Sequence, residues 1–208
     1  MFPEHLAPGA TKPPFTFPVL KFGRRRLPKV MFSIDIETLS TSKFAAVPTI
    51  GIAAFTADGV LESRHLMLNY DEQILDHGRH VEPRTLRWWL EQDEKVRNAT
   101  FLGENRMPAD DAFAVIDAMI FGIKAQFQEE RTIIWVKGPH FDTAILETLA
   151  EDYGVESSIT FRDWMDVRTI NLLSGYSAPK FDGAHNAEID AIEQAKEVIE
   201  GIRILDVQ

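Results

Sequence analysis

Cysteine is absent from this chain of 208 residues, so its chemistry cannot rest on a thiol. The absence excludes disulfide bonds, thiolate metal sites and cysteine nucleophiles. Long hydrophobic runs are also missing. The longest stretch without a charged residue covers only residues 44–57, whereas a membrane-spanning helix needs roughly 20 apolar residues. We therefore expect no membrane segment and a cytoplasmic setting.

Basic residues are scarce beyond the N-terminal segment. Residues 1–30 have a net charge of +5 and hold six of the eleven prolines, while residues 31–208 have a net charge of −15. We expect a proline-rich basic extension over residues 1–29 and one folded domain over residues 30–208. A start-site artefact is an equally good explanation of residues 1–29, because Met31 stands directly before the first expected strand. The overall charge of −10 counts against nucleic acid as a partner, because phosphate-binding surfaces are usually basic.

The order of expected strands and helices indicates a mixed α/β domain. Apolar residues alternate with polar ones in residues 32–37, which predicts a strand with one apolar face. Further strands are expected over residues 49–55, 61–68 and 132–136. Helices are expected over residues 83–92, 108–127, 141–153 and 186–203. Three strands followed by alternating helices and strands favour a mixed sheet covered by helices.

Two carboxylates stand two residues apart on the first expected strand. Asp35 and Glu37 project from the same face, with backbones roughly 6.6 Å apart. Their side chains can converge on one cation, and hard divalent ions such as Mg²⁺ prefer carboxylate oxygen. Taken alone, this pair is better explained as a solvated polar face at a sheet edge.

Two further acidic residues and one histidine lie at helix starts. Asp142 follows an apolar strand and Gly-Pro, in the first turn of a helix, where an acidic residue also complements the helix dipole. Asp190 lies beside a stripe of small residues near the start of the last helix. His185 precedes that helix and is expected on the loop that enters it. Each residue alone has an ordinary structural explanation.

Taken together, the three segments resemble a specific family. Asp-x-Glu-Thr at residues 35–38, Phe-Asp-x-x-Ile-Leu at 141–146 and His-x-Ala-x-x-Asp-Ala at 185–191 are similar to the three motifs of the DEDDh 3′→5′ exonucleases. The segments 85–92, 135–139 and 166–169 resemble the subgroup that contains phage exonuclease A and ribonuclease AS. The resemblance covers residues 30 to about 200. It implies a ribonuclease H-like fold, with a mixed five-stranded sheet flanked by helices. It also implies a protein of a bacterial or phage-infected cell.

The resemblance also implies the chemistry. Asp35, Glu37 and Asp190 would hold one divalent cation, Asp35 would also touch a second, and Asp142 would reach the second directly or through water. The two cations would be Mg²⁺ or Mn²⁺, and His185 would be the general base. The partners would be the 3′ ends of single-stranded DNA or RNA, or 3′ overhangs. The product would be a nucleoside 5′-monophosphate.

Six other residues are candidates for substrate binding. Trp88 and Trp89 diverge by about 100° on a helix, so one can pack inward while the other stacks on a base. Two core or interface aromatics are an equally good explanation of this pair. The other four flank the expected metal ligands: Thr38, Leu39, His140 and Phe141.

Two other functions stay open. A haloacid-dehalogenase-type phosphatase also begins with an acidic motif on an apolar strand, but its second acid and its downstream Lys and Gly-Asp elements have no counterpart in a suitable context. A binding module on the same fold that has lost catalysis is the other. The choice between DNA and RNA rests on whether a group reads the 2′-hydroxyl, which the sequence does not reveal. A homodimer is frequent in the family, and the oligomeric state is open.

Overall fold

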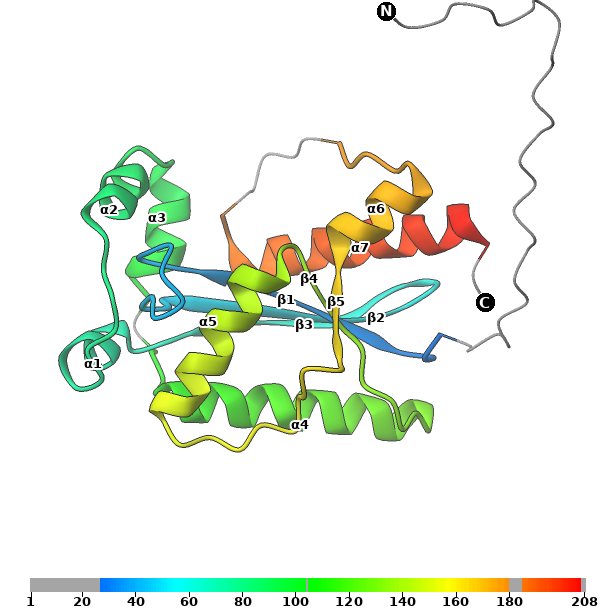
Figure 1. Cartoon of the computed structure of the whole chain (residues 1–208), viewed down its shortest axis with the longest axis horizontal. Helices are drawn as coiled ribbons and strands as arrows, with labels where there is room; N and C mark the ends of the chain where they lie inside the picture. Colours follow the sequence, from blue (N-terminus) through cyan, green and yellow to red (C-terminus); the bar gives the residue numbers. More distant parts are fainter. Residues whose placement is uncertain (1–26, 104, 180–184, 207–208) are drawn as a thin grey trace, which may run out of the picture.

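The domain is built on one mixed sheet, seen edge-on in Figure 1. The computed structural model describes residues 27–103, 105–179 and 185–206. Residues 1–26 of the expected extension lie outside this range, and the division of the chain at residue 29 stays a prediction. The strand order is β3-β2-β1-β4-β5. The strands are β1 (Met31–Glu37), β2 (Thr49–Thr56), β3 (Gly59–Met67), β4 (Ile134–Val136) and β5 (Trp164–Asp166).

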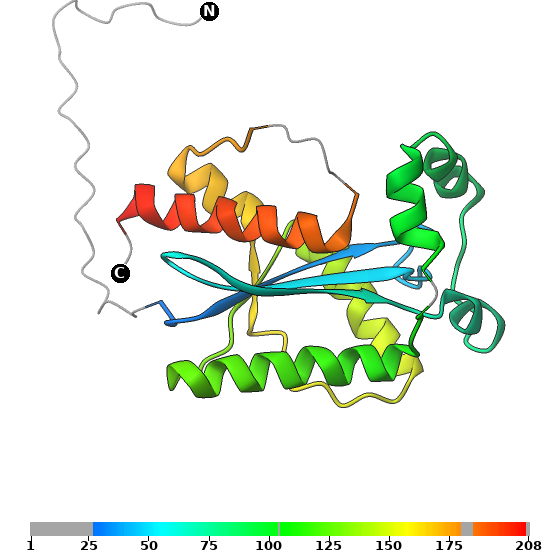
Figure 2. The same ribbon diagram turned by 180° about the vertical axis from the view of Figure 1, so that it is seen from behind.

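Strand direction follows the lengths of the connections. The first three strands form an antiparallel meander, connected through residues 38–48 and 57–58. After helical crossovers, β4 pairs in parallel with β1, and β5 pairs in parallel with β4. The helices are α1 (Tyr70–Leu75), α2 (Pro83–Leu90), α3 (Glu94–Phe101), α4 (Ala109–Phe127), α5 (Pro139–Asp152), α6 (Val167–Ser174) and α7 (Ala187–Leu205). Helices α6 and α7 cover one face of the sheet, and α4 and α5 cover the other (Figures 1 and 2). No helix within the described residues combines the length and apolar character of a membrane span.

The two faces of β1 enter different layers. Phe32, Ile34 and Ile36 are buried in the large core that includes α4 and α5. Ser33 and Asp35 point to the other face, where both side chains meet Gln194 of α7. The alternation expected of a strand thus directs the carboxylates of β1 toward α7.

Helix α7 packs unusually close to the sheet at its N-terminal end. Ala187 and Ala191 are fully buried, and a Cβ atom built on Gly51 of β2 would lie 1.9 Å from the carbonyl oxygen of Ala187. Only a residue without a side chain fits there, because that distance is shorter than any nonbonded contact allows. This close approach brings Asp190, three residues after Ala187, over the end of β1.

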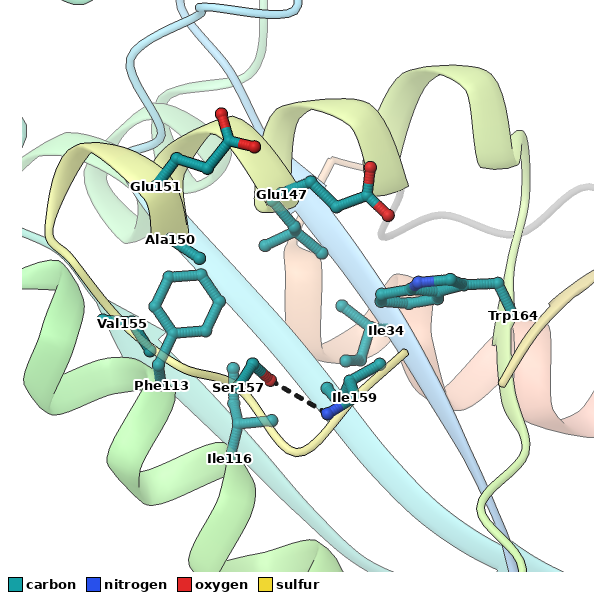
Figure 3. Close-up of a pocket in the computed structure, with 11 residues that line it drawn as sticks. Ile34, Phe113, Ile116, Glu147, Ala150, Glu151, Val155, Ser157, Ile159 and Trp164 are labelled. Atoms are coloured by element: carbon teal, nitrogen blue, oxygen red, sulfur yellow. Dashed lines mark hydrogen bonds between the residues drawn. The ribbon is translucent and has the colours of Figure 1, made fainter. Parts of the chain in front are cut away.

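An apolar pocket of about 230 Å³ lies on the opposite face of the sheet (Figure 3). Ile34 of β1 belongs to its wall, together with Phe113 and Ile116 of α4. Two carboxylates, Glu147 and Glu151, project from α5 beside it in Figure 3. This pocket shares β1 with the carboxylate site but opens on the other side of the sheet.

The fold class expected from the sequence is confirmed, and the long elements fall where the patterns predicted them. Four short elements had no prediction of their own: α1, α3, β5 and α6. Strand β5 has three residues and α1 has six, too few for a hydrophobic period to be recognised. The fifth strand followed only from the family resemblance.

Candidate active site

Three carboxylates gather where β1 ends under the start of α7. Asp35, Glu37 and Asp190 each offer an oxygen within 4.8 Å of the others. Glu37 is buried, and Asp35 and Asp190 are half-buried. The backbone N–H of His185 donates to Oδ2 of Asp190 at 2.7 Å, which ties the loop before α7 to the cluster. Carboxylate oxygens at this spacing form a ligand set for a hard divalent cation.

Asp142 approaches the same site from α5. Gly138, with φ 134°, turns the chain from β4 into α5, and Pro139 begins the helix. Asp142 lies in the first turn, is 6% exposed and accompanies the three carboxylates in one pocket. It is not one of the three residues whose oxygens lie within 4.8 Å of one another. The structure therefore brings Asp142 to the same pocket but outside this mutually close set of three.

The pocket that holds these groups has a volume of about 280 Å³. It lies between the end of β1, the start of α5 and the first three turns of α7, on the α7 face of the sheet. Its lining is strongly acidic. The lining residues are Asp35, Ile36, Glu37, Lys137, Phe141, Asp142, His185, Asp190, Glu193, Gln194 and Glu197.

The electrostatics of the pocket favour a bound cation. Burial, and then the charges of Glu37, Asp142 and Asp190, raise the pKa of Asp35 well above its usual range. Burial and the neighbouring carboxylates raise the pKa of Glu37 to about 8. Burial also raises the pKa of Asp142 to about 7 and that of Asp190 above its ordinary value. Without a cation, these groups repel one another, and burial favours their protonated forms; the donor set therefore fits a divalent ion.

Gln194 fixes one of the carboxylates. Its side chain is buried on α7, and its Nε2 donates to Oδ1 of Asp35 at 2.6 Å. The hydroxyl of Ser33 lies 3.4 Å from Oε1 of Gln194, which sets the orientation of the amide. The sequence reasoning missed this residue. Its position four residues after Asp190, on the same face of the helix, was the available signal.

His185 is held at the mouth of the pocket by two aromatic residues. Its backbone adopts φ 72° on the loop before α7, which agrees with the predicted place outside the helix. Its ring meets that of Trp88 edge-on, with centroids 4.7 Å apart and planes at 90°. Trp89 lies further away, at 6.5 Å between centroids. The imidazole is thus fixed between the acidic cluster and helix α2.

The two tryptophans of α2 have different environments. Trp89 is 2% exposed, packs against Leu39, and its Nε1 donates to the carbonyl oxygen of Thr38 at 2.9 Å. Trp88 is 38% exposed. Together with Phe141, which is 36% exposed, it lines a second pocket of about 360 Å³. One indole anchors α2 to the core, and the other offers an open aromatic surface.

The second pocket adjoins the acidic one. Ile36, Glu37 and Phe141 line both pockets, and Thr38 lines the second. Of the six predicted substrate-binding residues, four therefore line a pocket beside the carboxylates. Leu39 is buried in the small core with Ala46 and Trp89, and His140 is exposed on α5. Neither of these two belongs to the described lining of either pocket.

Comparison with known proteins agrees with this geometry. Residues 30–201 match the model of a family described as the 3′-5′ exoribonuclease Rv2179c-like domain. Among solved structures, the chain is similar to the nuclease domain of 3′hExo, a DEDDh family member, bound to rAMP. The similarity has a TM-score of 0.61 at 6% sequence identity and covers 85% of this chain and 92% of that one. No curated protein sequence matches the chain. The predicted resemblance to DEDDh 3′→5′ exonucleases is confirmed, while the subgroup stays a prediction.

Proposed function

Because this chain belongs to the Rv2179c-like 3′-5′ exoribonuclease domain family and is a 3′-5′ exonuclease, we propose that it shortens single-stranded RNA, or the single-stranded 3′ ends of RNA, one nucleoside 5′-monophosphate at a time. The observation that carries the proposal is the cluster of Asp35, Glu37 and Asp190 beside the aromatic pocket of Trp88. The family description supports RNA over DNA. The ribonucleotide bound to the structurally similar 3′hExo domain agrees with this choice.

The acidic residues would bind two metal ions in different combinations. Asp35, Glu37 and Asp190 would bind one Mg²⁺ or Mn²⁺, and Asp35 and Asp142 would contribute to a second. When bound, two such ions activate the attacking water and stabilise the leaving 3′ oxygen. The bond from Gln194 to Oδ1 of Asp35 keeps that carboxylate from rotating away from its neighbours, as groups behind metal ligands commonly do.

His185 is proposed to take the proton of the attacking water. An imidazole titrates near physiological pH, which suits a general base. The link between the backbone of His185 and Asp190 holds the residue next to the acidic cluster. The perpendicular ring of Trp88 limits the rotation of the imidazole. Both contacts would keep the base at one place relative to the reacting phosphate.

The 3′-terminal nucleoside is proposed to occupy the second pocket. Trp88 and Phe141 present the exposed aromatic surface on which a base can stack, independently of its identity. Because this pocket shares Glu37 with the acidic one, a nucleotide there places its 5′ phosphate at the carboxylates. That arrangement produces cleavage from the 3′ end.

Matched oligonucleotides test the proposal. RNA and DNA of one sequence, labelled at the 5′ end, are incubated with Mn²⁺ or with EDTA. We expect a ladder of RNA products shortened from the 3′ end, a weaker reaction on DNA, and no reaction in EDTA. A 3′-phosphorylated RNA should be a poor substrate. Binding without cleavage would identify a binding module instead, and release of inorganic phosphate from a small ester would identify a phosphatase; either result overturns the proposal.

A histidine pair tests the assignment of the base. His185→Ala should lower kcat by about 10²–10⁴-fold and leave Mn²⁺ binding, measured by calorimetry, within a few-fold of the wild type. His77→Ala is the matched control, because this exposed imidazole stacks on Tyr153 outside the pocket. Normal turnover of His185→Ala would remove this residue as the base.

A further inference from the structure

Two segments that the proposed mechanism does not use meet beside the acidic pocket. Strands β4 and β5 are parallel, with Val136 paired to Asp166, so the residues that follow both strands emerge at the same edge of the sheet. A Cβ atom built on Gly138 would lie 2.7 Å from Nη1 of Arg168. The guanidinium of Arg168 therefore lies directly over the backbone turn that leads to Asp142.

Lys137, the neighbour of Gly138, is held in the pocket by a buried acid. Its Nζ lies 2.5 Å from Oε1 of Glu197 on α7. The side chain of Glu197 is only 7% exposed, whereas that of Lys137 is 40% exposed. Nδ2 of Asn171 donates to the other oxygen of Glu197 at 2.5 Å. Glu197 is thus occupied by two partners, while the ammonium of Lys137 keeps donors for a group that enters from solvent.

Lys137 and Arg168 are basic side chains beside a pocket that is otherwise acidic. Lys137 is the only Lys or Arg among the described residues that line the pocket. Arg168 is exposed and has no ion pair with a carboxylate among the described residues. The charge of Arg168 lowers the pKa of Asp142 against the larger effect of burial, and the charge of Lys137 acts likewise on Asp190. Both cations therefore lie within electrostatic reach of the carboxylates.

The position of Lys137 relative to the two pockets indicates which part of a bound strand it would face. Lys137 lines the acidic pocket and is absent from the described lining of the Trp88 pocket, with which the acidic pocket shares Glu37 and Phe141. With the last nucleoside in the Trp88 pocket, as proposed, a strand that crosses the carboxylates would pass through the part of the acidic pocket that Lys137 lines. Its next phosphate then passes a cation in an otherwise acidic pocket.

From this arrangement we propose that Lys137 and Arg168 form a binding site for the phosphate that precedes the scissile phosphate in the substrate strand. The proposal rests on the proposed function, because it takes the scissile phosphate to lie at the carboxylates. Glu197 is a positioning residue in this site, since it reaches the substrate only through Lys137.

Two dinucleotides isolate this contact. The dinucleotide NpN contains only the scissile phosphate, whereas pNpN also carries the preceding one as its 5′ phosphate. With Mn²⁺, the wild-type enzyme should prefer pNpN by about tenfold in kcat/KM, the size of one charge-assisted contact. In Lys137→Met, Arg168→Gln and the double variant, this ratio should fall toward one. Because both substrates are tested on the same variant, any loss common to both cancels.

Longer RNA and matched controls complete the test. On a ten-nucleotide RNA, the slope of log kcat/KM against log salt concentration should become shallower by about 0.7 for the lost phosphate contact. Arg203→Gln removes an exposed arginine paired with Glu200 at the far end of α7 and should leave both the ratio and the slope unchanged. Glu197→Gln, which keeps a hydrogen bond to Lys137, should keep more of the preference than Glu197→Ala.

The outcomes separate this inference from the proposed function. A wild-type ratio near one, or an undiminished ratio in both Lys137→Met and Arg168→Gln, overturns the phosphate site while cleavage itself continues. If neither dinucleotide is cleaved, the longer RNA decides: a salt slope that is unchanged in both Lys137→Met and Arg168→Gln overturns the phosphate site. Absence of any cleavage by the wild type overturns the proposed function, and the phosphate site with it. Arg168 is exposed, so its variant remains informative even if a substitution of the more enclosed Lys137 impairs folding.

Discussion

The two faces of β1 carry pockets of opposite character. Toward α7, Asp35 and Glu37 face an acidic pocket; toward α4 and α5, Ile34 contributes to an apolar one (Figure 3). Successive side chains of one strand thus line an acidic pocket and an apolar one. The acidic face is tolerated because small residues of α7 leave space for carboxylates and a cation, whereas the apolar face contributes the burial that stabilises the sheet.

The largest expected effect is on the acidic face. Asp35→Asn keeps the shape of the side chain but removes a charge at the centre of the cluster, so cleavage should fall by at least about 10³-fold. The free energy of unfolding without metal should be unchanged or higher, because the substitution relieves repulsion. Oligonucleotide cleavage and urea unfolding measure the two quantities. Cleavage near the wild-type rate would remove Asp35 from the active site.

On the apolar face, the expected loss is in stability. Ile34→Ala should lower the free energy of unfolding by about 2–5 kcal/mol, because it enlarges an existing pocket that the surrounding side chains do not fill. Turnover at a temperature where the variant is folded should stay within about twofold of the wild type. A large fall in kcat with unchanged stability would show that the two faces are not separate.

A pH series measures the repulsion in the acidic pocket. The raised pKa values of Asp35, Glu37 and Asp142 mean that the metal-free native state binds more protons than the unfolded chain above about pH 4. Its free energy of unfolding should therefore fall as pH rises from about 4 to 8, by on the order of a few kcal/mol. Urea unfolding in EDTA measures this change, and saturating Mn²⁺ should reduce it. Glu37→Gln should flatten the dependence; a stability that rises over this range would contradict the electrostatic account.

The smallest effect is expected at the aromatic pocket. Trp88→Ala should raise KM for RNA about tenfold, within the roughly 1–3 kcal/mol that base stacking provides, while Trp88→Phe should keep most of the affinity. Trp89→Ala is the contrasting variant: this indole is buried and bonded to Thr38, so its loss should appear in thermal unfolding. An unchanged KM in Trp88→Ala would place the terminal base elsewhere.

The elements that the sequence predicted are those with a long regular pattern. The meander of β1 to β3 and helices α4 and α7 have enough residues for a hydrophobic period to appear. Helix α1 is short, and its Gln73 is buried because the amide bonds to both backbone groups of Val47. Arg79 is similarly buried against Asp152 and the carbonyl oxygen of Ala45. From the sequence, buried polar residues of this kind are expected at the surface, because the partners that satisfy them lie far away along the chain.

The sequence by itself determined which chemical groups this protein carries and on which elements they lie: three motifs, in order, hold the four carboxylates and the histidine. Only the tertiary structure decided how they are arranged, with three carboxylates close together, Asp142 in the same pocket, and Gln194, Trp88, Lys137 and Arg168 around them. The reason is physical. Local patterns fix the direction of a side chain within one strand or helix, but the distance between β1, α5 and α7 depends on packing, such as the contact between Gly51 and Ala187, which no local pattern contains.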